Sequence, residues 1–317
     1  MSKHNLKTNS KSVFLSVIIP VFNEEENINP LYHKTISSLK NSDYKYEIIF
    51  IDDGSTDNTL QNLLILQEKD NKLRIIKFST NHGKSDSYTI GFKLAKGNMI
   101  ITMDGDLQDD PAEIYKFVEK MEEGFDAIIG WKYKGKGFPS YIFNKFVSLI
   151  TGIRIHDFNC PFKAFRKSIL KDFNIYGELY RFIPILLHKK GFKIGEIKIE
   201  NYPRIHGKSK YGLEKFMRGF MDFLTVLFIT KYKYSPLHFF GFVGAMFVLA
   251  GFSIDAFLAI RGIFFAGRIG HFALLLMGIF LIIVGFQFLS VGLLGELIIS
   301  GRERDISYSE HINKNPK

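Results

Sequence analysis

The sequence lacks paired cysteines, a high density of charge and an apolar leader. Cys160 is the only cysteine among 317 residues, so no disulfide can form within the chain and a disulfide-stapled scaffold is excluded. Charged residues make up 23% and hydrophobic residues 46%, which excludes an intrinsically disordered chain. Residues 1–12 are polar and have no signal-peptide core, so we predict a short disordered tail there.

Two common phosphate-binding loops are also missing. The chain contains no Gly-x-x-x-x-Gly-Lys-[Ser/Thr] segment, and no Gly-x-Gly-x-x-Gly follows its first apolar run. These loops bind phosphates through backbone amides in nucleotide kinases and dinucleotide-dependent dehydrogenases. Both of these enzyme classes therefore lack support in the sequence.

The charge balance is basic. Lys and Arg number 42 against 32 Asp and Glu, which gives a net charge of +10 and indicates a polyanionic partner. That partner is a nucleic acid, a phosphorylated substrate or an anionic membrane face. The apolar residues gather towards the C-terminal end, which favours a membrane. The chain has no nucleic-acid recognition motif, so we predict no nucleic-acid partner.

From residue 13 to about 130, short apolar runs alternate with amphipathic segments, which indicates strands alternating with helices. Fully apolar strands are typical of a parallel sheet covered on both faces, so we predict an α/β doubly wound domain. Its ligand should bind at the carboxyl ends of the strands. The predicted strands are Val13–Val21, Glu47–Ile51, Leu73–Phe78, Asn98–Met103 and Asp126–Gly130, with helices near 25–40, 57–69, 84–96 and 111–123.

Residues 131–234 are less regular and more basic. Two segments, at about 141–153 and 213–232, mix large apolar side chains with Lys or Arg. Two interpretations stay open, namely helices packed on the core and amphipathic helices lying in the bilayer interface. We assign both segments to a domain of residues 13–234, followed by a membrane part at 235–300 and a tail at 301–317.

Two long runs near the C-terminal end carry no formal charge. Tyr234–Ile254 has 21 residues and Phe272–Gly295 has 24, and a membrane-spanning helix needs about 20. We therefore predict a transmembrane helical hairpin rather than a buried core helix. Glycines recur every seven residues within each run, at Gly244 and Gly251 and at Gly278, Gly285 and Gly292. Small residues allow close helix approach in lipid, so these faces should pack together or against another subunit.

Three polar residues interrupt this part of the chain. We expect Asp255 and Glu296 near helix ends, where a charge costs less, and we expect Gln287 to face protein rather than lipid. Basic residues flank the two runs: Lys208, Lys210, Lys215, Arg218, Lys231 and Lys233 precede the first, and Arg302 and Arg304 follow the second. The positive-inside rule then predicts that the large domain and both termini are cytoplasmic.

Three acidic clusters follow predicted strands, at 20–27 (PVFNEEEN), 52–57 (DDGSTD) and 104–111 (DGDLQDDP). Each alone is explained by turn and helix-cap chemistry. Together, at one edge of one sheet, they indicate a site. Asp104 and Asp106 can reach one cation, and hard cations such as Mg²⁺ or Mn²⁺ prefer oxygen ligands and bridge to phosphates. We therefore predict a metal-dependent site for a nucleoside diphosphate, in which the metal stabilises the departing diphosphate.

The segments VIIPVFNEEENI, IDDGSTDNT and TMDGDLQDDPAEI resemble the three signature segments of family 2 glycosyltransferases with the GT-A fold, and Asp104-Gly-Asp106 matches that family's DXD metal motif. Within the family, the chain most resembles the dolichyl-phosphate mannosyltransferase and bactoprenol (undecaprenyl-phosphate) glycosyltransferase group. The segments that carry this resemblance are NHGKSDSYTIGF, DFNCPFKAFR, ELYRFIPILLHKKGF and PRIHGKSKYG. The resemblance covers most of residues 13–300.

This resemblance implies a GT-A catalytic domain with two C-terminal transmembrane helices, and a membrane-bound enzyme of the bacterial cytoplasmic membrane. The enzyme would transfer a sugar from a nucleotide sugar, for which we favour UDP-glucose, to undecaprenyl phosphate with inversion. Other donors stay open, namely GDP-mannose, a UDP-N-acetylhexosamine and a UDP-aminoarabinose derivative, as do a homo-oligomer and an inactive membrane scaffold. A processive polysaccharide synthase is disfavoured, because Trp131, the single tryptophan, lies outside any Gln-x-x-Arg-Trp motif.

The resemblance also implies roles for individual residues. The metal would be held by Asp104, Asp106 and Gln108, and the catalytic set would add Asp157 and Arg181. The nucleotide would be bound by Pro20, Asn23, Glu24, Asp52, Asp53 and Lys84. The acceptor phosphate and the diphosphate would lie near Lys163, Arg204, Ser209 and Lys210.

The chain departs from the family pattern at three places. Gly105 replaces the common alanine of the metal motif, which we expect to be tolerated because that side chain is not a ligand. Lys132 replaces a frequent arginine, and Pro161-Phe162-Lys163 replaces Gly-Phe-Arg. A lysine keeps the charge but loses the bidentate phosphate contacts of arginine.

Overall fold

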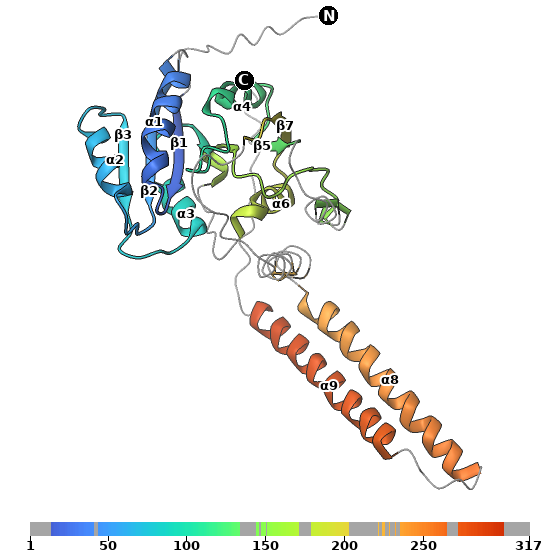
Figure 1. Ribbon diagram of the computed structural model, residues 1–317. Coiled ribbons are helices and arrows are strands. Elements are labelled where there is room, and N and C mark those ends of the chain that lie inside the picture. The colour runs from blue at the N-terminus through green and yellow to red at the C-terminus, as the bar shows by residue number, and fades with distance from the viewer. Residues whose placement is uncertain are drawn as a thin grey trace, which may run out of the picture. The chain divides into compact units, whose positions relative to one another are not determined.

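The computed structural model describes residues 14–40, 44–133, 144–145, 147–149, 151–170, 179–202, 221, 224–225, 228, 232, 235–264 and 272–300. The chain divides into two compact units, Met1–Val226 and Leu227–Lys317 (Figure 1). The predicted tails and most of the two predicted amphipathic segments lie outside the described residues. The division at residues 234 and 235 and the interfacial role of those segments stay predictions.

The first unit is built on a seven-stranded sheet. Its first five strands lie on the predicted apolar runs: β1 (Phe14–Val21), β2 (Lys45–Asp52), β3 (Leu73–Lys77), β4 (Met99–Thr102) and β5 (Ala127–Lys132). Strand β1 pairs in parallel with both β2 and β4. The strand order therefore reverses at β1, and the switch point lies between β1 and β4.

Two further strands were not predicted, and they correct the expectation of a purely parallel sheet. Strand β6 (Lys163–Arg166) lies antiparallel between β4 and β5, and β7 (Ile194–Ile199) extends β5 in parallel, giving the order β3-β2-β1-β4-β6-β5-β7. Strand β6 has only four residues and a lysine at its start, so it carries no periodic signal. Its insertion brings Lys163 beside Thr102 at the end of β4.

Helices cover both faces of the sheet. The predicted helices are observed as α1 (Glu25–Lys40), α2 (Thr59–Gln67), α3 (Lys84–Leu94) and α4 (Ile114–Glu122), and α4 continues the short 3₁₀ turn η2 (Pro111–Glu113). The Asp110 side chain caps η2 by accepting from the Ala112 amide at 3.0 Å, with Pro111 in the first position, as predicted. Beyond β6 follow η3 (Lys167–Leu170), η4 (Leu179–Phe182) and α6 (Ile183–Lys189).

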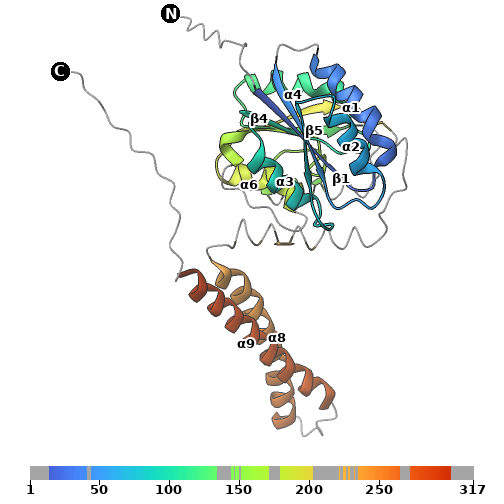
Figure 2. The same ribbon diagram turned by 90° about the vertical axis from the view of Figure 1, so that its left-hand side faces the viewer.

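The hydrophobic core lies mainly on one face of the sheet. Helices α1, α2 and α4 bury Leu31, Leu63 and Phe117 there against Val17 and Phe50 of the sheet. Helix α3 covers the opposite face, where Gly91 lies so close to β1 that an added Cβ would be 2.7 Å from Ile18 Cγ2. Figure 2 shows α3 and α6 on the other side of the sheet from α1 and α4. Both faces are thus covered, as predicted.

A buried carboxylate ties the turn after α3 to the sheet. Glu47 on β2 accepts a hydrogen bond from Ser16 Oγ at 2.6 Å, from the Lys96 amide, and from Arg74 Nη1 at 2.7 Å. Burial raises the pKa of Glu47, but the hydrogen bonds from Ser16, Lys96 and Arg74 outweigh burial and hold that pKa below its usual value. The ionised carboxylate therefore stabilises this end of the sheet.

Replacing Glu47 by glutamine should lower the free energy of unfolding at pH 7 by about 1.5 kcal/mol, because charge-assisted hydrogen bonds are lost. The lowered pKa of Glu47 gives stability that is present above the unfolded-state pKa of about 4.3 and is lost as the pH falls through the folded-state pKa. The difference between wild type and variant, measured by denaturant titration, should therefore shrink below about pH 4. Glu68→Gln, at an exposed site after α2, should leave the free energy of unfolding unchanged. An equal loss of unfolding free energy in both variants would contradict the stabilising role of the Glu47 carboxylate.

The second unit contains two helices that are long and apolar enough to cross a membrane. They are α8 (Pro236–Phe264) and α9 (Phe272–Ser300). In their most apolar windows only 17% and 11% of the residues are buried, whereas the core helix of a soluble protein would be mostly buried. Within the described residues the chain therefore has two largely exposed apolar helices that could span a membrane.

The glycine faces of the two helices pack together, as predicted. A Cβ added to Gly244 would lie 2.6 Å from the Gly285 carbonyl oxygen, and one added to Gly251 would lie 2.5 Å from the Gly278 carbonyl oxygen. These contacts involve backbone atoms, so the helices approach as closely as the absence of side chains permits. The prediction of packing within the chain is confirmed.

One of the three expectations about polar residues was wrong. Helix α8 continues past Asp255 to Phe264, and Asp255 lies against Gly278 rather than near a helix end, because the glycine leaves room for the carboxyl group. Gln287 is exposed on α9, and its expected contact with protein stays a prediction. Glu296 does lie near the end of α9, where its carboxylate accepts from the Leu237 amide at 3.4 Å and so caps the start of α8.

Candidate active site

The loops after β1 and β2 are joined by hydrogen bonds. Asn23 has a φ of 55°, a backbone conformation that asparagine tolerates better than most residues. Its side-chain oxygen accepts from the Thr56 amide at 2.8 Å, and its own amide donates to Ser55 Oγ at 3.0 Å. The Glu24 amide donates to Thr59 Oγ1 at 2.8 Å. The first two acidic clusters therefore lie side by side and are joined by hydrogen bonds. Within the strands that precede them, Pro20 of β1 is paired with Ile51 of β2.

Asp52, the last residue of β2, and Asp53, which follows it, are buried and accept hydrogen bonds from backbone amides. Asp53 accepts from the amides of His82 at 2.7 Å and Gly83 at 2.8 Å, and Asp52 Oδ1 accepts from the Ser55 amide at 3.0 Å. Gly54, which follows Asp53, has a φ of 75°, and a Cβ there would lie 2.6 Å from the backbone of Thr80. In this structure Asp53 therefore holds the loop that leads into α3.

The metal-motif carboxylates follow β4 at the switch point of the sheet. Asp104 Oδ1 lies 2.6 Å from the Lys84 ammonium at the start of α3. Asp106 is buried, and its Oδ1 accepts from the Gln108 amide at 3.2 Å. The intervening Leu107 has a φ of 61°, which is strained for a leucine and is typical of backbone held in a functional loop.

Gly105 brings this loop against β1. An added Cβ would lie 2.7 Å from Val21 Cγ1, closer than real Cβ atoms approach. An alanine here would therefore require Val21 to move. The glycine allows the Asp104–Asp106 segment to lie directly against the end of β1, beside the loop that begins the first acidic cluster.

An ion pair beneath this loop was missed by the sequence analysis. Asp109 Oδ1 lies 2.7 Å from Lys132 Nζ, and Asp109 Oδ2 accepts from the Asp104 amide at 3.4 Å. Burial raises the pKa of Asp109 to about 6, although Lys132 opposes this rise. The pKa of Lys132 is lowered by burial and raised more strongly by Asp109 and its neighbours. Asp109 belongs to the third acidic cluster, so its sequence position was the available signal.

A second basic group lies on β6. Lys163 is 2% exposed and donates to the Tyr180 carbonyl at 3.3 Å. Burial lowers the pKa of Lys163 to about 8, while the nearby Cys160, Asp157 and Asp104 oppose this and Arg181 adds to it. Arg181 is buried and its Nε donates to Tyr180 Oη at 3.3 Å. Lys163, Arg181 and Asp104 therefore lie within electrostatic reach of one another.

Asp157 is buried at the end of a well-fixed loop. Glu196 on β7 accepts from the amides of His156 at 2.8 Å and Asp157 at 3.2 Å, and its other oxygen lies 2.7 Å from His156 Nδ1. The His156 ring stacks on Trp131 with centroids 4.0 Å apart. One carboxylate and one indole thus fix the backbone that carries Asp157.

The donor set suits a divalent cation that is completed by a substrate. Among the described residues no group of three or more His, Cys, Asp or Glu side chains could hold a metal. Mg²⁺, however, usually binds one or two carboxylates together with substrate phosphates and water. Asp104 already faces one cation, the Lys84 ammonium. The carboxylates of Asp104 and Asp106 and the side-chain amide oxygen of Gln108 therefore fit a metal that is bound together with a diphosphate.

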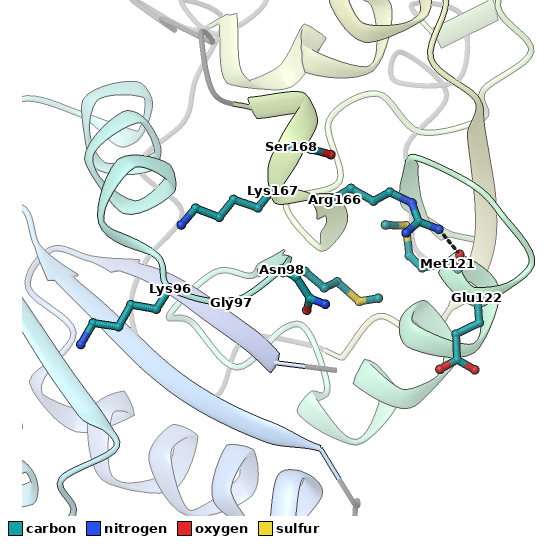
Figure 3. A pocket seen from close by; sticks show the side chains of 9 residues that line it. Lys96, Gly97, Asn98, Met121, Glu122, Arg166, Lys167 and Ser168 are labelled. Atoms are coloured by element: carbon teal, nitrogen blue, oxygen red, sulfur yellow. Dashed lines mark hydrogen bonds between the residues drawn. The ribbon is translucent and has the colours of Figure 1, made fainter. Parts of the chain in front are cut away.

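A cavity of about 560 Å³ lies elsewhere, and Figure 3 shows the side chains that line it. Its lining includes Met99 at the start of β4 and Arg166 at the end of β6, so it lies at the opposite end of these strands from Asp104. Arg166 donates to the carbonyls of Phe125 at 3.0 Å and Met121 at 3.1 Å, and Lys167 donates to Ala95 at 2.6 Å. These cations hold backbone carbonyls, and the cavity contains none of the predicted site residues.

Three predicted site residues, Arg204, Ser209 and Lys210, lie outside the described residues. Tyr202, two positions before Arg204, is described, and its amide donates to the Gln108 carbonyl at 3.2 Å. Tyr202, the last described residue before Arg204, therefore lies beside the loop that carries Asp104, Asp106 and Gln108. The other predicted site residues lie in the first unit, at or near the carboxyl ends of β1, β2 and β4, on the neighbouring α3, β6 and η4, or, for Asp157, in the loop before β6.

Comparison with known proteins gives a consistent result. The model of the family described as glycosyl transferase family 2 matches residues 16–173. The dodecaprenyl-phosphate galacturonate synthase of Rhizobium johnstonii is 34% identical over 95% of this chain and 92% of its own length. The undecaprenyl-phosphate 4-deoxy-4-formamido-L-arabinose transferase of Shewanella sediminis is 32% identical over 92% of this chain and 89% of its own.

A solved structure shares the fold. The glucosyl-3-phosphoglycerate synthase of Mycobacterium tuberculosis, in complex with Mn²⁺, uridine diphosphate and phosphoglyceric acid, aligns with a TM-score of 0.54. It covers 68% of this chain and 78% of its own, at 17% identity. At that identity the likeness supports the GT-A fold alone, including the mixed sheet.

Proposed function

The chain belongs to glycosyl transferase family 2, within its polyprenyl-phosphate group, and we propose that it transfers a sugar from a nucleoside diphosphate sugar to a polyprenyl phosphate at a membrane. The carboxylate pair Asp104 and Asp106, at the switch point of the sheet and within reach of buried cations, is the observation that carries this proposal. The names of the two relatives support the acceptor class.

The proposed chemistry forms a bond between an acceptor phosphate oxygen and the anomeric carbon. The bond from that carbon to the diphosphate breaks, and its electron pair leaves with the diphosphate. The acceptor phosphate is already ionised at neutral pH, so a strong general base is not needed. In-line displacement at the anomeric carbon inverts its configuration.

The residues of this chain bind and orient the two phosphate groups. Lys163 and Arg181 supply buried positive charge beside Asp104, which stabilises the negative charge that develops on the leaving diphosphate. Asp104, Asp106 and Gln108 would hold Mg²⁺ or Mn²⁺, which supplies further charge stabilisation when bound. Pro20, Asn23, Glu24, Asp52, Asp53 and Lys84 form the proposed nucleotide side of the site.

The acceptor side and the membrane orientation are proposals from sequence. Arg204, Ser209 and Lys210 follow Tyr202 in the chain, and we assign them to the acceptor phosphate. From the basic residues that flank α8 and α9 we propose that the first unit and both termini are cytoplasmic, at the bacterial inner membrane. Arg204→Ala should then weaken use of the lipid phosphate while leaving nucleotide binding largely intact.

The donor is proposed as a uridine diphosphate sugar. UDP-glucose is our first candidate from the sequence, and the names of the relatives add a galacturonate and a formamido-arabinose to the sugars worth testing. The experiment is a donor screen against undecaprenyl phosphate in detergent, with Mn²⁺, Mg²⁺ or a chelator, in which lipid products are weighed by mass spectrometry. A lipid product of any donor supports the reaction class, and its mass identifies the sugar. Absence of product with every donor and both metals contradicts it.

Lys163 gives the reaction a predicted alkaline limit. Its pKa is lowered to about 8 chiefly by burial, so the charged form is lost as the pH rises through that value. Because the charged form binds the diphosphate, kcat/KM should fall above about pH 8. Lys163→Arg should remove this alkaline fall in kcat/KM, since arginine stays charged. Lys167→Arg, at the far end of β6 from Asp104, should keep the wild-type profile, and an unchanged alkaline fall in Lys163→Arg would contradict the assignment.

A further inference from the structure

Two hydroxyl groups on α3 are buried without a hydrogen bond. Tyr88 is 2% exposed and Ser85 is 3% exposed, and among the described residues neither hydroxyl oxygen has a hydrogen-bond partner. The two residues are three positions apart, so they lie on the same face of the helix. Most buried hydroxyls in folded proteins are paired, so two orphans on one face require an explanation.

The Tyr88 ring is held firmly against its neighbours. It stacks on Phe92 with centroids 6.0 Å apart and contacts the Tyr180 ring at 5.7 Å. Tyr180 in turn carries the two contacts to the buried cations, because its carbonyl accepts from Lys163 and its hydroxyl from Arg181. The phenol is thus fixed within the wall of the candidate active site rather than in the general core.

The electrostatic surroundings of the Tyr88 hydroxyl include carboxylates of the candidate site. Burial raises the pKa of Tyr88 well above its usual value, and the carboxylates of Asp104 and Asp109 raise it further, together with Tyr180 and Cys160. The group therefore stays protonated at any physiological pH and acts as a hydrogen-bond donor. It lies within electrostatic reach of the same carboxylate that contacts Lys84.

An unpaired buried hydroxyl destabilises the free protein, because its desolvation is not compensated. A phenylalanine would fill the same space without that cost. Tyr32 on α1 provides the contrast, because its hydroxyl donates to Asp70 Oδ2 at 3.0 Å. A hydroxyl that costs stability in the free protein is suited to pairing with a bound molecule instead.

We propose that the Tyr88 hydroxyl, with Ser85 beside it, binds an oxygen of the nucleotide sugar next to Asp104, so that this face of α3 helps to select the donor. The inference rests on the proposed function. The oxygen belongs either to the diphosphate or to the transferred sugar, and both offer the acceptor that a protonated phenol needs.

The test compares two tyrosine-to-phenylalanine variants of the full-length protein. Tyr88→Phe should lower kcat/KM for the donor about tenfold, which corresponds to about 1.4 kcal/mol, while leaving the melting temperature unchanged or higher. Tyr32→Phe should do the reverse, with a lower melting temperature and unchanged kcat/KM. Ser85→Ala should resemble Tyr88→Phe with a smaller loss. Unchanged kcat/KM in Tyr88→Phe, or a loss accompanied by a lower melting temperature, would overturn the proposal.

Calorimetric titration with UDP and with UDP-glucose, both with Mn²⁺, locates the contact. Equal weakening of both ligands in Tyr88→Phe supports the diphosphate as the partner, and weakening of UDP-glucose alone supports the sugar. Unchanged affinity for both would overturn the proposal. If the wild type binds both ligands but transfers no sugar to lipid, the proposed function fails while this binding test still decides the role of Tyr88.

Discussion

Asp106→Asn should lower sugar transfer at least about a thousandfold, the range seen when a group that stabilises transition-state charge is removed. Asparagine keeps the size of Asp106 and its acceptor oxygen for the Gln108 amide, so the loop should still fold. The neutral amide, however, loses the charge that a divalent cation needs from a hard oxygen ligand. The measurement is the initial rate of lipid-linked product formation at saturating metal.

Asp110→Asn is the matched control in the same loop. The Asp110 carboxylate caps η2 through the Ala112 amide, and asparagine is also a good cap. Its transfer rate should stay within about twofold of wild type, in line with the small effect of exchanging two good caps. Equal losses in both variants, or metal-dependent turnover retained in Asp106→Asn, would remove the metal motif from the account.

Gly251→Leu should destabilise the membrane hairpin by about 3 kcal/mol, the upper part of the range for overpacked interiors. The first added carbon would already lie 2.5 Å from the Gly278 carbonyl and 3.0 Å from the Ile282 amide, and these backbone atoms move only if the helices separate. Leucine has a higher helix propensity than glycine, so a loss would come from packing. This loss of stability is measured by unfolding the protein in mixed micelles while monitoring helix content by circular dichroism.

Gly241→Leu on the same helix provides the comparison. A Cβ there would meet only the Leu237 side chain at 3.5 and 3.8 Å and the Leu289 side chain at 3.9 Å, all of them able to change rotamer. Its cost should stay below about 1 kcal/mol, as for most substitutions away from a tight contact. Equal stability of Gly251→Leu and Gly241→Leu would show that the glycine faces do not hold the hairpin together.

Apolar periodicity located the regular half of the first unit well. The five predicted strands and four predicted helices up to residue 132 are present, because each lies in an apolar or amphipathic run bounded by turn residues. Strand β6 was not predicted, since four residues beginning with a buried lysine carry no periodic signal. Its antiparallel insertion depends on tertiary pairing with Thr102 and Ile129, which local sequence does not encode.

The helix pair α8 and α9 shows the same limit to prediction from local sequence. Seven-residue glycine spacing was enough to predict which faces pack, because helical geometry fixes the face of each residue. The end of α8 was misjudged, since Asp255 was interpreted as a boundary, although the missing side chain of Gly278 leaves room for its carboxyl group within the helix pair. A charge at an interface depends on the partner helix, which the run of residues around it does not reveal.

The site followed from the sequence where residue type alone carries the chemistry. Asp104 and Asp106 were identified as oxygen ligands at a strand end, and both lie at the switch point. The ion pair of Asp109 with Lys132 and the orphan hydroxyl of Tyr88 were missed. Their importance comes from burial and from partners distant in sequence, and Tyr88 reads as an ordinary apolar position of an amphipathic helix.

The account depends on a cation held by two carboxylates that makes an otherwise acidic edge bind a diphosphate. Calorimetric titration of the purified full-length protein with UDP-glucose and with UDP, in Mn²⁺ and after chelation, tests this directly. The account predicts binding in Mn²⁺ that weakens at least about tenfold on chelation, a difference of about 1.4 kcal/mol, and that is absent in Asp106→Asn. Equal affinity with and without the metal, or binding that persists unchanged in Asp106→Asn, would contradict it.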